Sequence, residues 1–117
     1  MADEIRQDEI QATLQRMVSL LVQRRFEEIE RVTNGKRLSA DAIKNAIAAY
    51  GRELVEPPRG AFDGCNVVVV TVSELPCVDV TMRLWIREEG ECDLSIDLTL
   101  TRIGKWLEVA IDDLHVK

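Results

Sequence analysis

Four side chains near the end of the chain could do chemistry together, namely Glu88, Cys92, Asp113 and His115. His115 is the only histidine, and a histidine beside a carboxylate can act as a general base. A cysteine next to it could become a thiolate nucleophile or join a metal site. The strand alignment derived below brings all four to one end of a sheet, at the mouth of the space between sheet and helices. We therefore interpret them as a candidate catalytic cluster.

A second interpretation is that these residues are ordinary solvated side chains at a sheet end, next to an acidic turn. The apolar residues from Leu114 onwards alternate in the opposite phase from those that end at Ile111. A β-bulge near residues 112–113 would account for that change of phase, and it would turn His115 outward. The four side chains would then no longer lie close together. The sequence leaves both interpretations open.

The elements that must position these residues are strands, because apolar and polar residues alternate from residue 78 to residue 111. Such alternation predicts an antiparallel sheet with one apolar face. We place one turn at residues 89–91 and a two-residue loop at residues 103–104. The expected pairs are Ile86 with Leu94, Met82 with Leu98, Arg83 with Asp97, Arg87 with Asp93, Leu100 with Leu107, Leu98 with Val109 and Ile96 with Ile111. Residues 67–72 are apolar on both faces and predict one further strand in a more buried position.

The N-terminal half is predicted to be helical up to a proline-rich junction at residues 56–60. Apolar residues recur at helical spacing over residues 4–23, and the stripe then rotates, which predicts a bend near residues 23–25 and a second short helix. Ser39 is a plausible N-cap for a third helix that ends near Gly51. We expect one domain over residues 1–117, with a helical half (1–55) and a sheet half (61–117).

The charge balance and the apolar content of the chain exclude some classes of binding partner. The chain has 117 residues, with 21 acidic against 15 basic side chains and a formal charge of −6, which argues against direct binding to nucleic acid. The start of the chain has no cationic and apolar leader, and the longest apolar run is too short to span a membrane. Three cysteines without a Cys-x-x-Cys pair predict free thiols and no metal or cofactor. We expect a cytoplasmic protein.

Only the helices are available to cover the apolar face of the sheet, so the expected fold class is α+β, with N-terminal helices on one face of a curved antiparallel sheet of about four strands. The order of elements resembles the cone-shaped nuclear transport factor 2-like fold, through residues 17–32 and 104–116. Several motifs also resemble an uncharacterised bacterial domain family of unknown function, over most of the chain. These motifs are Arg37-Leu38-Ser39-Ala40, Ala49-Tyr50-Gly51, Leu84-Trp85, Glu88-Glu89-Gly90, Asp93-Leu94 and Ile111-Asp112-Asp113-Leu114-His115-Val116. The resemblance implies no reaction.

The outward face of the predicted sheet carries both tryptophans, Trp85 and Trp106, among charges that include Arg83 and Asp97. Large aromatic residues amid charges often mark a contact surface, and the alternative is a half-solvated sheet face. We favour a non-enzymatic interaction module, either a homodimer or an immunity-type protein that binds a basic partner. The second hypothesis is a small-molecule-binding or enzymatic cone, with the Cys, His and carboxylate cluster at its mouth and room for a small apolar ligand.

Overall fold

A computed structural model describes residues 5–35, 37–70 and 74–116. Three helices and a short 3-10 helix (η1) precede four strands, which confirms the α+β class. The elements are α1 (Gln7–Val22), α2 (Phe26–Thr33), α3 (Ala40–Tyr50), η1 (Arg59–Gly64), β1 (Asn66–Val69), β2 (Cys77–Ile86), β3 (Gly90–Ile103) and β4 (Trp106–Val116). The strands form one antiparallel sheet in the order β1-β2-β3-β4. β1 is an edge strand, and the predicted buried position is wrong, because Val68 and Val69 are 53% and 67% exposed. Residues 71–72 of the predicted strand lie outside the described residues.

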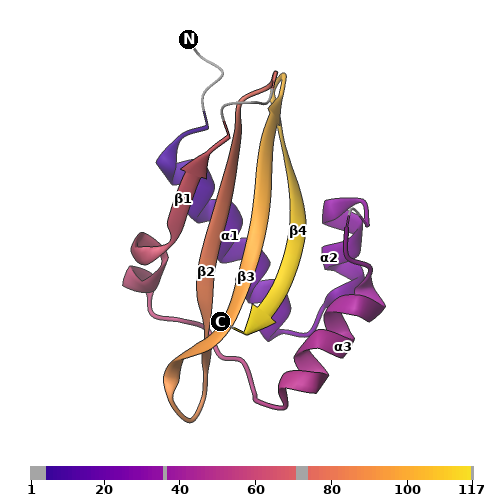
Figure 1. Cartoon of the computed structure of the whole chain (residues 1–117), viewed down its shortest axis with the longest axis vertical. Helices are drawn as coiled ribbons and strands as arrows, with labels where there is room; N and C mark the ends of the chain where they lie inside the picture. Colours follow the sequence, from indigo (N-terminus) through magenta and orange to yellow (C-terminus); the bar gives the residue numbers. More distant parts are fainter. Residues whose placement is uncertain (1–4, 36, 71–73, 117) are drawn as a thin grey trace.

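The helices lie on one side of the sheet and beside β4, so the opposite face is left open (Figure 1). In Figure 1, α1 runs behind the strands, and α2 and α3 lie next to β4. The covered face holds the hydrophobic core. Its fully buried side chains include Leu14 and Met17 of α1, Ile29 of α2, and Leu84 and Leu98 of the sheet. The predicted apolar stripe and the predicted apolar sheet face are both confirmed.

The break between α1 and α2 falls where the rotated stripe predicted it. Arg24 has a φ of 59°, in the left-handed region, which ends α1 and redirects the chain into α2. Asn34 has a φ of 57° and closes α2 in the same way. Asparagine tolerates this conformation better than most residues. The two short helices can therefore pack beside β4 instead of continuing away from the sheet.

The N-cap of α3 supports a first prediction. Ser39 Oγ accepts a hydrogen bond from the Ala42 N–H at 3.1 Å, as the sequence predicted. Ser39→Ala is expected to lower the free energy of unfolding by about 1 kcal/mol, because it leaves that donor without its cap. Urea unfolding followed by circular dichroism measures the change. Ser39→Thr keeps the hydroxyl and is the control, so an equal loss in both variants would contradict the role of the cap.

Most residues are paired two positions away from the predicted register, and beside the first turn the difference is four positions, since Ile86 lies opposite Gly90. Met82 lies opposite Ile96, and Leu100 lies opposite Val109. The first turn is formed by residues 87–89, with Gly90 at a φ of 79°, and is not centred on Gly90. Such a three-residue loop followed by a left-handed glycine is a common hairpin connection. Because side chains alternate with a period of two, a shift by an even number of residues keeps the side chains of β2 and β3 on their predicted faces.

The predicted charge pairs across β2 and β3 are wrong for the same reason. Arg83 lies opposite Ser95, and Asp97 lies opposite Thr81. The ion pair that Arg83 makes is a loose one with Glu91, at 3.9 Å between Nη1 and Oε1. The second hairpin is also displaced, since Ile103 pairs with Trp106 around residues 104–105. These changes decide which side chains meet on the open face.

Candidate functional site

A β-bulge in β4 determines the geometry of the site. Asp97 pairs with Asp113, and the neighbouring Leu98 pairs with Ile111, so Asp112 is an extra residue in β4. Beyond the bulge the alternation changes phase, which buries Leu114 in the core and turns the residues around it outward. This is the bulge that the reversed alternation after Ile111 predicted.

The four residues of the predicted catalytic cluster therefore do not meet. Cys92 lies in the hydrophobic core, where its Sγ is 3.9 Å from the Leu94 carbonyl oxygen. Glu88 lies in the β2–β3 turn and forms an ion pair with Arg52 at 3.4 Å. Asp113 and His115 point to the open face. The expectation of a shared site at the mouth of the cone is wrong, because the bulge reverses the two β4 side chains.

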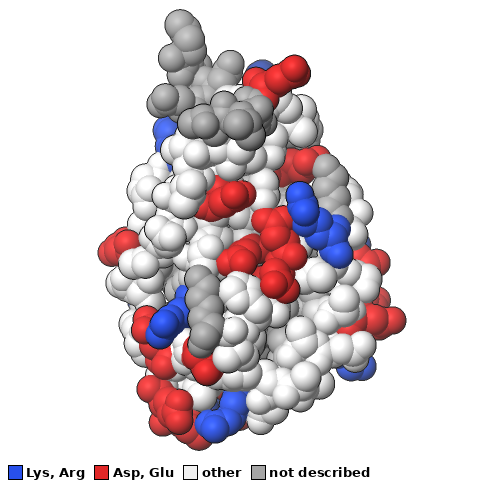
Figure 2. Space-filling view, viewed as in Figure 1, with Lys and Arg blue, Asp and Glu red and all other residues white. Residues whose placement is uncertain are grey.

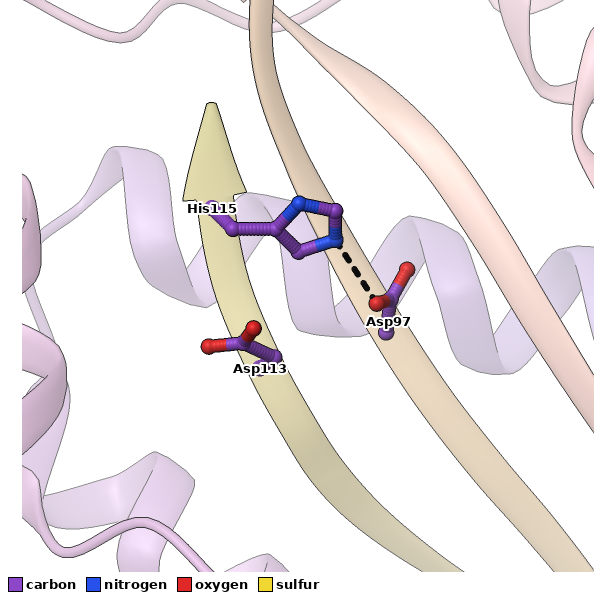
Figure 3. A group of neighbouring side chains, drawn as sticks. All are labelled: Asp97, Asp113 and His115. Atoms are coloured by element: carbon purple, nitrogen blue, oxygen red, sulfur yellow. Dashed lines mark hydrogen bonds and ion pairs between the residues drawn. The ribbon is translucent and has the colours of Figure 1, made fainter. Parts of the chain in front are cut away.

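Asp113 and His115 instead meet Asp97 of β3 on the open face (Figure 3). His115 Nε2 lies 2.8 Å from Asp97 Oδ2, and the two side chains are 30% and 29% exposed. One nitrogen or carboxylate oxygen of each of the three residues lies within 4.8 Å of the others. A protonated Nε2 would donate to Asp97, and a protonated imidazole would form an ion pair with it.

The same three residues could hold a divalent cation, since one imidazole and two carboxylates are ordinary metal ligands. Within the described part of the chain, this is the group whose ligand atoms approach so closely. The hydrogen bond of His115 to Asp97 already uses the nitrogen that points into the group (Figure 3). We therefore interpret the group first as part of a larger acidic surface.

That surface, here called the acidic face, consists of Asp79, Asp97, Asp112 and Asp113. Thr99 links two of its members, because its Oγ1 lies 2.9 Å from Asp79 Oδ1 and also contacts Asp112. A hydroxyl has one hydrogen and can donate to only one of two carboxylates. Figure 2 shows acidic side chains gathered in the middle of the open face. Charges held this close repel one another and favour a cation nearby.

Among the described residues, one cation already lies against the acidic face. Arg37, in the segment between α2 and α3, places its Nε 2.8 Å from Asp112 Oδ1. The residue comes from the helical half and is distant in sequence from β4. It shows that a guanidinium can reach these carboxylates. The other three members of the acidic face have no ion pair with Lys or Arg among the described residues.

The two tryptophans lie at opposite ends of the sheet, as predicted. Trp85 pairs with Glu91 near the β2–β3 turn, whereas Trp106 pairs with Ile103 at the other hairpin. Trp106 is 78% exposed. Trp85 is half-buried, and its indole packs over Gly90. The candidate interface residues Arg83, Trp85 and Asp97 thus share the open face, and Trp106 stands apart from them.

The comparisons with known proteins identify the family. The family model described as Domain of unknown function (DUF7668) matches residues 18–117, which is most of the chain. The chain belongs to this DUF7668 family. No curated protein and no solved structure gives a significant match, so the comparisons assign no activity. The predicted resemblance to an uncharacterised domain family is confirmed.

The matched part of the DUF7668 domain contains the whole acidic face and the bulge in β4. It also contains all six motifs that carried the resemblance, and the structure joins two of them. Tyr50 Oη donates a hydrogen bond to Asp93 Oδ1 at 2.7 Å, which raises the pKa of Tyr50. This contact ties the end of α3 to β3. In the described part of the chain, no helix is long and apolar enough to cross a membrane.

The cysteines of this DUF7668 domain are poorly placed for nucleophilic chemistry. All three are free thiols, as predicted, and Cys77 and Cys92 are buried. Cys65 is half-buried at the end of η1, where burial raises the pKa of its thiol. A raised pKa leaves little thiolate at neutral pH.

Sequence analysis missed three features of the site. Arg37 could not be assigned, because it reaches the acidic face from a distant segment. Thr99 and Asp79 face each other only in the observed register. Ser95 was given no role, although it is fully buried beside Arg83 and His115 of the neighbouring strands. The reversed alternation after Ile111 was the one signal in the sequence that pointed to the observed site.

Proposed function

We propose that this domain is a non-enzymatic interaction module whose acidic face binds a basic protein partner. The observation that carries the proposal is the gathering of Asp79, Asp97, Asp112 and Asp113 on the face of the sheet that the helices leave open (Figure 2). Complementary charge speeds association and selects partners. Arginine and lysine side chains of a partner would meet carboxylates that now face one another.

A basic partner accounts for the acidic face better than a homodimer does. In a two-fold dimer, the same surface patch of both copies meets at the interface. Carboxylates of one copy would then face carboxylates of the other, and the formal charge of −6 on each chain would oppose association. A homodimer would have to use another surface. The proposed partner therefore carries a cluster of Lys or Arg residues.

The positions of the predicted catalytic residues favour this proposal over the alternative of an enzyme with a cone-shaped fold. Cys92 lies on the covered face of the sheet, and Glu88 lies in the β2–β3 turn. Both are therefore away from Asp113 and His115. The space between sheet and helices holds the side chains of one hydrophobic cluster, which includes Met82, Leu84 and Leu98. Core packing is the ordinary use of such residues. Apart from the buried Cys92 thiol, the buried members of this cluster carry no group for acid, base or nucleophilic catalysis.

A peptide rich in Lys and Arg, labelled with a fluorophore, tests the proposal. Asp97→Asn with Asp113→Asn is expected to weaken its binding about three- to tenfold, because each lost ion pair at an exposed site contributes roughly 0.2–1 kcal/mol. Fluorescence anisotropy measures the dissociation constant at low and at physiological salt. The loss is expected to shrink at high salt.

The matched control is Glu27→Gln with Glu74→Gln, which changes the net charge equally at two exposed positions. This variant is expected to bind the peptide almost as the native chain does. Thermal unfolding of both variants checks that each remains folded. An equal loss of affinity in the two variants would overturn the proposal, because it would mean that net charge, and not the acidic face, attracts the peptide.

We also propose that the fold is nuclear transport factor 2-like and that the protein works in the cytoplasm. Three helices that precede a curved antiparallel sheet and cover one of its faces support the first proposal (Figure 1). Three free cysteines support a reducing compartment. A solved structure of a relative with this arrangement would test the fold.

A further inference from the structure

A pocket of about 390 Å³ lies between η1 and the open face of β2 and β3. It is distinct from the Asp97, Asp113 and His115 group. Among the residues that line it are Gly60, Gly64, Asn66, Arg83, Trp85 and Ser95. Around Gly60 and Gly64, no described residue other than the two neighbours in the chain lies within 4 Å of an added Cβ, so the η1 wall is not crowded. A volume in this range suits a small ligand.

Two polar atoms at this pocket lack the partners that buried groups normally have. Ser95 is 0% exposed, and its Oγ has no hydrogen-bond partner among the described residues. Trp85 Nε1 is also buried and also without a partner there. Leaving such a group unsatisfied costs free energy, and most buried polar groups in folded proteins are hydrogen-bonded. Both atoms are covered by neighbouring atoms, so a bound group would reach them only after the side chains that cover them move.

The chemistry of these atoms specifies what that group must offer. An indole N–H can only donate a hydrogen bond, so Trp85 requires an acceptor. The Ser95 hydroxyl can donate to the same group. Arg83 adds a guanidinium at the pocket, held only loosely by Glu91 at 3.9 Å. Arginine prefers planar oxyanions that accept two parallel hydrogen bonds.

We propose that this pocket binds a carboxylate. Its two oxygens would accept from Trp85 Nε1, Ser95 Oγ and the Arg83 guanidinium. A cation is disfavoured, because Arg83 would repel it and the indole cannot coordinate it. A phosphate is disfavoured by its second negative charge, since Glu91 lines the pocket and Asp97 is nearby in β3. The carboxylate could belong to a free small acid or to the C-terminus of a peptide.

The two tryptophans allow a direct test by NMR. In a ¹⁵N-labelled protein, the indole N–H signals of Trp85 and Trp106 are distinguished with the Trp106→Phe variant, which changes a side chain 78% exposed. Benzoate represents a free acid, and N-acetylglycylglycine represents a peptide C-terminus. Benzamide and the peptide amide are their neutral controls. A saturable shift of the Trp85 signal is expected with a carboxylate and not with its amide, while the Trp106 signal stays fixed.

Variants separate binding from a structural role. Arg83→Gln is expected to weaken carboxylate binding about tenfold or more, since a charge-assisted hydrogen bond is lost. Ser95→Ala is expected to weaken binding without lowering the melting temperature of the free protein, because the hydroxyl makes no hydrogen bond there.

Three results would overturn the proposal. One is an unchanged Trp85 signal with both carboxylates up to their solubility limits. Another is an equal response to the amides. The third is full binding in Arg83→Gln. A response to benzoate alone assigns a free acid, and a response to the peptide alone assigns a chain end. The test does not use the acidic face, so its result is independent of the basic partner proposed above.

Discussion

Replacing Leu98 with alanine is expected to lower the free energy of unfolding by about 2–5 kcal/mol. Leu98 is 0% exposed at the centre of β3, where it lies opposite Val80 and Ile111. The truncation removes buried apolar surface and leaves a cavity that its neighbours fill only partly. Domains of this size are stable by about 5–15 kcal/mol, so a large share of the stability would be lost.

Urea unfolding measures this loss, and Ile103→Ala is the matched control in the same strand. Ile103 is 41% exposed, and its truncation is expected to cost less than about 1 kcal/mol. If Leu98→Ala costs no more than Ile103→Ala, the packing of the helices on this face of the sheet is wrong. A change in the dependence on urea concentration would instead indicate a change in the unfolded state.

Gly90→Ala is expected to destabilise the domain by about 1–3 kcal/mol, for two physical reasons. Gly90 has a φ of 79°, a conformation that costs alanine more than glycine. An added Cβ would also lie 3.2 Å from Trp85 Cζ3, so the indole would have to shift. The fluorescence of Trp85 is therefore expected to change together with the stability.

Gly51→Ala separates the two contributions. Gly51 has a φ of 75°, but an added Cβ there would have no described residue within 4 Å apart from its neighbours in the chain. This variant thus carries the backbone strain alone. The difference in unfolding free energy between the two variants reports the contact with Trp85. Equal losses and an unchanged indole spectrum would contradict the packing of the ring on Gly90.

The sequence predicts the faces of the sheet better than its register. Leu98 is apolar and lies in an alternating run, so its inward position follows from the period of two. That same period cannot distinguish registers that differ by two residues. The conformation of the first turn decides between them, and Gly90 was placed at its centre instead of at its end. The predicted partner of Arg83 was wrong as a result, although its face was correct.

The candidate site was partly predictable for a related reason. His115 and Asp113 were recognised as residues that could act in catalysis, and the reversed alternation at Leu114 was the sign that a bulge would turn His115 outward. Their partner Asp97 follows only from the observed pairing of β3 with β4. Arg37 is positioned by the packing of α2 and α3 beside β4, which no local pattern encodes. Cys92 was assigned to the site because its inward-facing side chain was predicted to lie at the mouth of a pocket. In the structure that side chain is part of the hydrophobic core.

The half-buried thiol of Cys65 makes the domain easy to study with a reporter dye. Its two neighbours in the chain, Gly64 and Asn66, both line the pocket beneath η1, and the other cysteines are buried. A maleimide fluorophore should thus attach at one native position, without mutagenesis. Because burial raises the pKa of this thiol, the labelling proceeds faster in mildly alkaline buffer. The emission of the attached dye then monitors events at that pocket in real time.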